Sequence, residues 1–167
     1  VAFKAEGEII LLIGETRGHL GQSLYLREIE KREEGSAPPV DLAAEKRNGD
    51  FVRELIEAGR VDTVHDCSDG GLLVTLAEMA MAGRMGARLA LADASIPALY
   101  GEDQARYVVA VPGKSLRKLL QALDSAGVPH SAIGTTGGDA LILPGEKPIS
   151  VTELRNKHEG WLPKYMA

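Results

Sequence analysis

The sequence has one cysteine, few aromatic residues and no apolar run of membrane-spanning length, and each shortage excludes a class of protein. Cys67 alone supports neither an intramolecular disulfide nor a thiolate zinc site, so a reducing compartment, the cytoplasm, is the expected location. The apolar run at residues 9–13 is far too short to cross a bilayer, and nothing resembles a signal peptide. We therefore expect no membrane partner.

Clustered basic residues are also missing. The chain carries 19 Lys and Arg against 24 Asp and Glu, which gives a net charge of -5. Binding to nucleic acid needs Lys and Arg gathered on one surface to neutralise phosphates, so no nucleic-acid partner is expected. What remains is an ordinary globular composition with 44% hydrophobic and 26% charged residues over 167 positions. A single domain over residues 1–167 is the expected organisation.

Periodicity and turn residues predict mixed strands and helices. Residues 7–14 (GEIILLIG) are expected to form a strand that is buried on both faces. Asp41 is expected to start a helix that stops at Gly59, and Thr152 is expected to cap the last helix. A hairpin is predicted around Gly137 and Gly138. Further strands are predicted at 61–65, 87–91 and 106–111, the hairpin strands at 130–135 and 140–143, and further helices at 18–30, 72–82, 115–126 and 152–161.

These elements favour an α+β fold, a layered α/β domain with a mixed sheet, over a strictly alternating parallel one. The helix at 72–82 is so apolar that it should lie centrally in the molecule. Thr75 and Glu78 share one of its faces, so they are expected to line any wet cavity beside it.

The stretch VHDCSDGG, residues 64–71, sets polar side chains and two glycines directly before that helix. In a functional interpretation, Asp66 holds magnesium, and the amides near Gly70 and Gly71 approach a phosphate. In a purely structural interpretation, Ser68 or Asp69 caps the helix and the glycines permit a tight turn. Spacing alone slightly favours the structural interpretation, because no phosphate-binding loop with a lysine is present.

Two further features near this stretch have structural explanations. His65 is expected to be a strand-end histidine with one hydrogen-bonded nitrogen rather than a base or ligand. The segment LGQS, residues 20–23, with Arg17 upstream, is a second glycine-containing turn. It is expected to be only a turn, and the alternative is that it faces the same cavity.

The string HDCSDGGLLVTLAEMAMAG resembles the HDxSDGGL…LAEMA signature in the last domain of the phosphoribosylformylglycinamidine synthase (FGAM synthetase) family. Four other segments agree in the same order, so the resemblance covers nearly the whole chain. They are LIGETRGHLGQSLYLREI, PPVDLAAEKRNGDFV, YGEDQARYVVAV and ELRNKHEGWLPKYM. The last two argue against other members of the superfamily, such as selenophosphate synthetases, thiamine-monophosphate kinases and hydrogenase-maturation proteins.

The resemblance implies the second C-terminal-type domain of a larger enzyme of the aminoimidazole ribonucleotide synthetase superfamily, ending at the natural C-terminus. That enzyme is a purine-biosynthesis ligase, which uses ATP, magnesium and glutamine-derived ammonia to convert formylglycinamide ribonucleotide into its amidine. ATP activates the formamide oxygen as a phosphate ester, which ammonia then displaces. The implied partners are the remaining domains of the synthetase, a glutaminase subunit and a small accessory protein.

The resemblance also bears on the residues of the turn. The catalytic residues are implied to lie outside this chain, so the fragment should be inactive alone. Asp66 becomes a candidate metal ligand, and Ser68, Asp69, Gly70 and Gly71 become candidate contacts for a nucleotide, ATP or ADP with Mg²⁺. The alternative is a scaffold domain without its own ligand site. A domain separated from its companions exposes an apolar face, so self-association is expected.

Overall fold

Strand β1 (Ile9–Ile13) lies inside the sheet because its side chains are apolar on both faces. Ile10 and Leu12 pack into the core on one face, and Leu11 and Ile13 pack into the core on the other. β1 pairs antiparallel with β4 (Tyr107–Val111) on one side and with β5 (His130–Thr136) on the other. The prediction of a strand buried on both faces is therefore confirmed.

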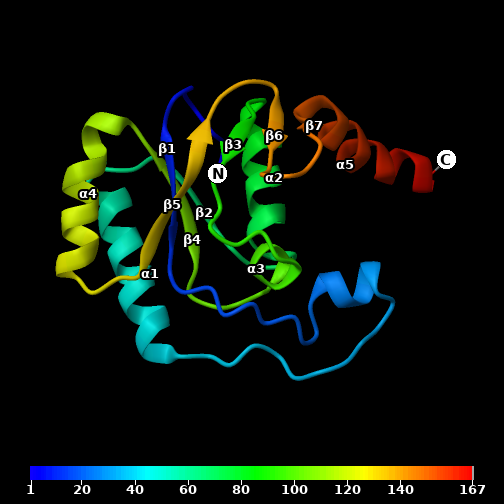
Figure 1. Ribbon diagram of the computed structural model, residues 1–167, viewed down its shortest axis with the longest axis horizontal. Helices are drawn as coiled ribbons and strands as arrows, with labels where there is room; N and C mark the ends of the chain where they lie inside the picture. Colours follow the sequence, from blue (N-terminus) through cyan, green and yellow to red (C-terminus); the bar gives the residue numbers. More distant parts are fainter. Residues whose placement is uncertain (167) are drawn as a thin grey trace.

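The computed structural model describes residues 1–166, and in it helices cover both faces of a seven-stranded sheet (Figure 1). The strands lie in the order β2-β4-β1-β5-β3-β6-β7, and only the β3–β6 pair is parallel. The expected layered α+β domain with a mixed sheet is confirmed. The remaining strands are β2 (Thr63–Asp66), β3 (Ala87–Leu89), β6 (Ala140–Ile142) and β7 (Ile149–Ser150).

The helices divide between the two faces of the sheet, α1 and α4 on one and α2, α3 and α5 on the other (Figure 1). Helix α2 buries Leu72, Leu76 and Met79 against the sheet and also contacts α3 and α5, as its apolar sequence predicted. The helices are α1 (Leu42–Glu57), α2 (Gly71–Gly83), α3 (Ile96–Tyr100), α4 (Gly113–Ser125) and α5 (Val151–Met166), and η1 (Tyr25–Ile29) is a single π-helical segment.

Helix α1 begins where the sequence predicted, because Asp41 caps it. The Asp41 carboxylate accepts hydrogen bonds from the amides of Ala43 at 3.0 Å and Ala44 at 3.1 Å. These bonds, above all that from Ala44, hold the pKa of the Asp41 carboxyl below its usual range. The last helix differs, since the side chain of Ser150, not Thr152, accepts the hydrogen bond from Glu153 N.

The predicted hairpin around Gly137 and Gly138 is wrong. Strand β3 lies between β5 and β6, so the two strands joined by this turn never pair with each other. The physical reason is that Gly86, just before β3, takes both hydrogen bonds of the turn: Gly86 N donates to Gly138 O, and Gly137 N donates to Gly86 O. The turn therefore connects β5 to β6 by passing over the residue that precedes β3, instead of joining two paired strands.

Of the helix predicted at 18–30, the structure has only the π-helical segment η1. The segment 93–104, predicted as turns, contains the short helix α3. Asp103 accounts for part of the first difference, because its carboxylate accepts the amides of Arg17, Gly18 and His19 and holds them outside any helix.

Helix α5 leaves the body of the molecule (Figure 1). Only Val151, at its start, is fully buried. Its last turns expose Trp161, Leu162, Tyr165 and Met166, and the Trp161 and Tyr165 rings stack on each other with centroids 5.2 Å apart. Among residues 1–166, no helix has the length and apolar character needed to span a bilayer.

Glu8, directly before β1, is a buried acid with an unsatisfied oxygen. The residue is 7% exposed, and its Oε2 has no hydrogen-bond partner among the described residues. Burial raises the pKa of the Glu8 carboxyl, the nearby Asp62 carboxylate raises it further, and Lys4 lowers it. The carboxyl is therefore harder to ionise in the folded protein than in the unfolded chain.

This shift predicts how stability depends on pH. A pKa raised on folding stabilises the protein below the ordinary value of 4.5, and this contribution is lost as the pH rises through the folded pKa. Glu8→Gln should therefore raise Tm at neutral pH by roughly 2 °C. The gain should vanish below the ordinary pKa of 4.5, where the Glu8 carboxyl is protonated in both the folded and the unfolded chain. Thermal unfolding across pH measures it, with Glu146→Gln, at an exposed position, as the control. A gain that is independent of pH would contradict the prediction.

Candidate functional site

The turn predicted as a site joins the end of β2 to the start of α2. Asp66 is the last residue of β2; its side chain is 61% exposed, and its Oδ1 lies 3.1 Å from His65 Nδ1. Cys67 turns inward to the core, where burial raises the pKa of its thiol. Ser68 and Asp69 are exposed. The turn therefore presents two carboxylates and one hydroxyl to solvent, while its cysteine is a packing residue.

The start of α2 is capped by a carboxylate from elsewhere in the chain. Gly70 N donates to Glu102 Oε1 at 2.8 Å, and Gly71 N donates to Ser68 O at 3.0 Å. Neither the Ser68 nor the Asp69 side chain caps the helix, so that part of the structural interpretation is wrong. The reason is that Gly70 occupies the N-cap position, where it has no side chain, and Glu102 reaches across to its amide.

The two glycines are required by packing. Gly70 and Gly71 adopt φ of 80° and 68°, a left-handed region that favours glycine. A Cβ on Gly71 would lie 2.6 Å from Gly101 O and 2.8 Å from Tyr100 C. The end of α3 therefore lies directly against this turn, and the glycines have a structural role whether or not a ligand is present.

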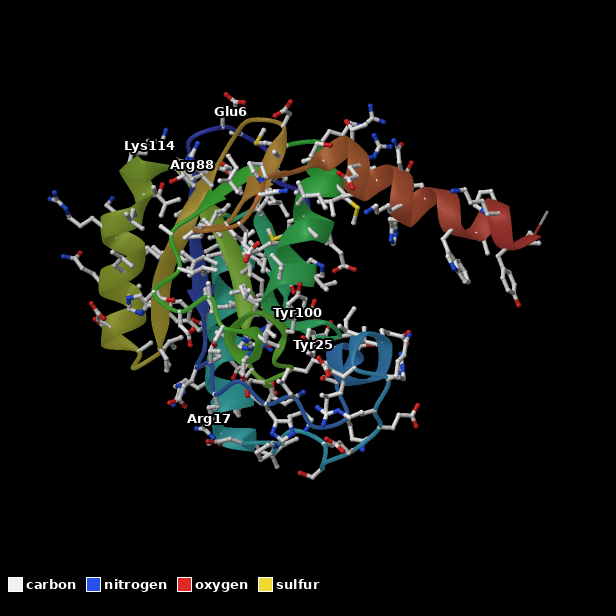
Figure 2. All side chains as sticks on the ribbon, turned by 45° about the vertical axis from the view of Figure 1, so that its right-hand side comes forward. Glu6, Arg17, Tyr25, Arg88, Tyr100 and Lys114 are labelled. Atoms are coloured by element: carbon white, nitrogen blue, oxygen red, sulfur yellow. The ribbon has the colours of Figure 1, made fainter. Side chains whose placement is uncertain are left out.

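Glu102 also holds the second glycine-containing turn. Its Oε1 accepts a hydrogen bond from Leu24 N at 2.8 Å, so one carboxylate oxygen bridges the start of α2 and the start of η1. Tyr25 and Tyr100 pack together beside this bridge, with ring centroids 5.0 Å apart (Figure 2). The segment LGQS thus lies next to the VHDCSDGG turn, which sequence analysis had left as the less favoured possibility.

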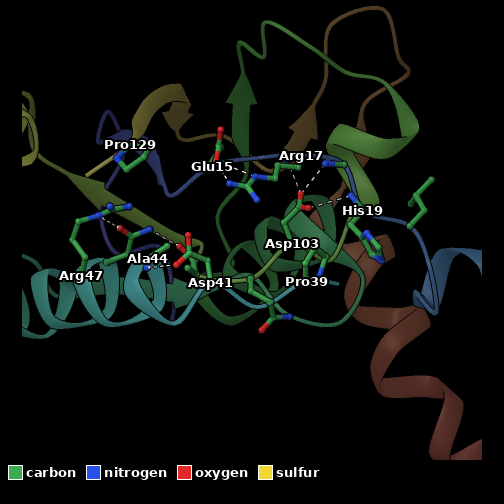
Figure 3. Close-up of a pocket in the computed structure, with 14 residues that line it drawn as sticks. Glu15, Arg17, His19, Pro39, Asp41, Ala44, Arg47, Asp103 and Pro129 are labelled. Carbon is green, nitrogen blue, oxygen red and sulfur yellow. Dashed lines mark hydrogen bonds and ion pairs between the residues drawn. The ribbon is translucent and has the colours of Figure 1, made fainter. Parts of the chain in front are cut away.

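Asp103, the next residue, fixes the chain that leads into that turn (Figure 3). Its Oδ2 accepts the amides of Arg17 at 2.9 Å and Gly18 at 2.8 Å, and its Oδ1 accepts the amide of His19 at 3.1 Å. Consecutive amides that converge in this way form an anion-binding concavity, and here the anion is a side chain of the protein. Glu102 and Asp103 therefore both occupy positions where an external anion would otherwise bind.

Arg106 stabilises the same segment from inside. It is 1% exposed, and its guanidinium donates to Gly101 O, to Asp103 O at 3.2 Å and to Thr16 Oγ1 at 3.2 Å. Sequence reasoning missed these roles, although GEDQAR in a turn-rich segment offered a signal: two adjacent acids and an arginine in a loop between apolar elements. Their partners lie tens of residues away, so spacing gave no indication of them.

A polar cavity of about 490 Å³ opens beside Asp103 (Figure 3). Its charged side chains are largely paired within the protein. Arg17 binds Glu15 with a nitrogen–oxygen distance of 2.7 Å, Asp41 caps α1, and Arg47 Nε donates to Asn48 Oδ1 at 3.1 Å. The charged groups of the cavity are therefore mostly engaged within the protein, and both signs of charge are present in its lining, so the cavity does not clearly select an anion or a cation.

His65 binds two carboxylates rather than the single partner that was expected. Its Nδ1 lies 3.1 Å from Asp66 Oδ1 and its Nε2 lies 3.0 Å from Glu78 Oε2. Thr75 does not join Glu78 in lining a wet cavity, because its hydroxyl is buried and donates to Gly71 O and Asp66 O. The imidazole thus ties the strand end to the exposed side of α2.

Whether the turn fits a metal or nucleotide depends on its free groups. Among residues 1–166, no three His, Cys, Asp or Glu side chains are placed to hold a metal ion together. The amides of Gly70 and Gly71 already have acceptors, and Asp66 Oδ1 lies 3.1 Å from His65 Nδ1. The exposed side chains of Ser68 and Asp69 and the second carboxylate oxygen of Asp66 are left to meet a ligand. The turn alone does not make a complete magnesium or phosphate site. The assignment of these five residues to a ligand stays a prediction.

Comparison with known proteins gives matches over most of the chain. The family model described as AIR synthase related protein, C-terminal domain, matches residues 5–143. Phosphoribosylformylglycinamidine synthase subunit PurL of Bradyrhizobium sp. (strain BTAi1) is 60% identical over 169 residues, which cover 99% of this chain. They cover only 23% of that relative, so the chain spans about a quarter of its length.

Solved structures show the same fold at low sequence identity. Thermotoga maritima PurL complexed with FGAR superposes with a TM-score of 0.72 at 19% identity, over 92% of this chain and 28% of that one. T. maritima PurL complexed with ATP gives a TM-score of 0.67 at 17% identity, over 92% and 26% of the two chains. At such identities the likeness concerns the fold alone.

Proposed function

Because the chain belongs to the family of AIR synthase related proteins, C-terminal domain, we propose that it forms one domain of a phosphoribosylformylglycinamidine synthase. The observation that carries this proposal is the 60% identity to a PurL subunit over 99% of the chain. In the proposed enzyme, ATP activates the formamide oxygen of formylglycinamide ribonucleotide, and glutamine-derived ammonia displaces the phosphate to give the amidine. The proposed enzyme is an ATP-dependent C–N ligase of purine biosynthesis. Its proposed location is the cytoplasm.

The proposed role of this domain is to complete the synthetase rather than to catalyse alone. The chain spans 23% of its relative, and Glu102 and Asp103 beside the candidate site are engaged in holding the turns of this domain. We propose that this domain contacts the other domains of the same synthetase. The glutaminase subunit and the small accessory protein are proposed partners of the assembled enzyme. The proposal covers residues 1–167 as one domain, the second C-terminal-type copy.

Reconstitution tests this proposal. The synthetase lacking this domain, the isolated chain, and the two mixed are assayed for ADP release with formylglycinamide ribonucleotide, ATP and ammonium. We expect each part to be inactive alone and the mixture or the intact polypeptide to be active. Turnover by the isolated chain, or full activity of the synthetase without it, would contradict the proposal.

Nucleotide binding by the VHDCSDGG turn is a second proposal, with ATP or ADP and Mg²⁺ as the ligand. Asp66 would hold the metal, and Ser68 and Asp69 would contact the nucleotide beside Gly70 and Gly71. The exposure of the three side chains supports it, as does the binding of ATP by the structurally similar T. maritima PurL. The occupied amides favour the alternative, a scaffold turn in which Glu102 supplies the negative charge at the start of α2.

Calorimetric titration with Mg-ADP and Mg-ATP distinguishes these interpretations. With a complete site, Asp66→Asn should weaken binding at least about tenfold, a loss of about 1.4 kcal/mol. Asp139→Asn, at an exposed position far from the turn in sequence, is the matched control. If neither the isolated chain nor the intact enzyme loses affinity on Asp66→Asn, the scaffold interpretation holds.

Self-association is a third proposal, and it concerns the end of α5. Trp161 is 63% exposed, and Leu162, Tyr165 and Met166 are exposed next to it. Such a cluster favours burial against another surface. Light scattering across protein concentration should show dimers or larger species, which Trp161→Ser combined with Tyr165→Ser should reduce. A monomer at every concentration would contradict the proposal.

A further inference from the structure

An apolar groove with a basic rim lies on the face of the sheet opposite α2. It forms where the C-terminal end of α1, the last residue of β4 and the first turns of α4 meet, and its volume is about 640 Å³. Its floor consists of Leu55, Val111, Leu119 and Ala122. This size falls within the range of roughly 300 to 1,000 Å³ typical of small-molecule sites, which are mostly apolar with a few polar groups.

The rim of the groove carries only positive charge. Arg60, Lys114 and Lys118 line it, together with the Ser115 hydroxyl, and no carboxylate does. Among the described residues, none of the three cations takes part in an ion pair, whereas most other Arg and Lys side chains that line a cavity do or are hydrogen-bonded to a neighbour. In a chain of net charge -5, this concentration of unpaired cations favours an anion.

The start of α4 adds to the same positive potential. Its N-cap residue, Pro112, offers no side-chain hydrogen bond, and its first turn contains no acid. Lys114 lies in that turn instead, so the positive end of the helix dipole and a cation are adjacent without compensation. A Cβ on Gly113 would meet nothing within 4 Å, so the approach to this turn is open.

We infer that this groove binds a small organic phosphate, whose apolar body rests on the floor while its phosphate contacts the basic rim. A phosphate is favoured over a carboxylate because three cations and an open helix start match a dianion better than a monoanion. An apolar body is favoured over inorganic phosphate because the groove beneath the basic rim is lined by Leu55, Val111, Leu119 and Ala122 and has room for more than a phosphate group. The site is separate from the VHDCSDGG turn, since the sheet lies between them.

The test uses 1-naphthyl phosphate as the probe, followed by amide chemical shifts of the isotope-labelled chain. We expect shifts centred on Leu55, Val111 and Leu119, and binding that weakens as salt is raised. The variant Lys114→Gln/Lys118→Gln should weaken binding at least about tenfold. The control Lys147→Gln/Lys164→Gln removes the same charge from exposed positions outside the groove, and it should bind as the parent does.

Two further ligands decide the chemical class. 1-Naphthol, which lacks the phosphate, and inorganic phosphate, which lacks the apolar body, should both bind at least about tenfold more weakly. The inference is overturned if 1-naphthyl phosphate causes no shifts at about millimolar concentration, if Lys114→Gln/Lys118→Gln leaves its affinity unchanged, or if either partial ligand binds as well. Groove shifts that appear on raising protein concentration alone would assign the groove to a second copy of the chain and also overturn it.

Discussion

Arg106→Met should lower the free energy of unfolding by about 4 kcal/mol, because it leaves buried carbonyl groups without donors. Arg106 is 1% exposed, and its guanidinium holds Gly101 O, Asp103 O and the Thr16 hydroxyl together. Methionine nearly preserves the length of the side chain, so most of the loss should come from the hydrogen bonds. The GEDQAR segment, which orients Glu102 and Asp103, should loosen first.

Urea unfolding measures this effect, with Arg88→Met as the matched control. Arg88 lies on β3 with its side chain exposed, and no ion pair holds it within the described part of the chain. The control should therefore change the free energy of unfolding by less than about 0.5 kcal/mol. Equal losses in the two variants would show that the buried guanidinium does not stabilise the segment.

Gly71→Ala should cost about 2 to 5 kcal/mol, because two penalties act at this position. A non-glycine residue at φ of 68° costs about 1 to 2 kcal/mol. The added Cβ would also lie 2.6 Å from Gly101 O and 2.8 Å from Tyr100 C, and both are backbone atoms that cannot turn aside. Such overlap typically costs a further 1 to 3 kcal/mol, roughly.

Gly138→Ala separates the two penalties. Gly138 has φ of 71°, nearly that of Gly71, but a Cβ there would meet nothing within 4 Å. Its loss should be only the conformational part, about 1 to 2 kcal/mol. Denaturant unfolding of both variants measures the difference. If the two substitutions cost the same, the close approach of α3 to the turn carries no energetic penalty.

Local signals in the sequence predicted the elements whose causes lie within a few residues. Asp41 was placed correctly as the start of α1 because its carboxylate bonds amides two and three positions along the chain. β1 was placed correctly because an unbroken apolar run suits a strand covered on both faces. Periodicity likewise gave α2 and α4 to within two residues at every end.

Interactions between distant segments were not predictable in this way. A Gly-Gly turn between two apolar runs is the usual signal of a hairpin, but the pairing at Gly137 is decided by Gly86, some fifty residues earlier. Glu102 replaces the local cap at Gly70 for a similar reason. The motif at 64–71 located the turn correctly, yet it gave no indication that a carboxylate from another loop occupies the amide of Gly70.

The position of β1 inside the sheet has a consequence for how the chain folds. Both of its neighbours, β4 and β5, come about 100 residues or more later in the sequence. Pairings of such high sequence separation must close large loops first, and they slow folding from microseconds toward milliseconds or seconds. During synthesis, β1 leaves the ribosome well before both of its partners, so both of its edges stay unpaired until β4 follows, and one edge stays unpaired until β5 does. An apolar strand with unpaired edges is prone to pair with other chains, so a chaperone that covers β1 in this interval would limit aggregation.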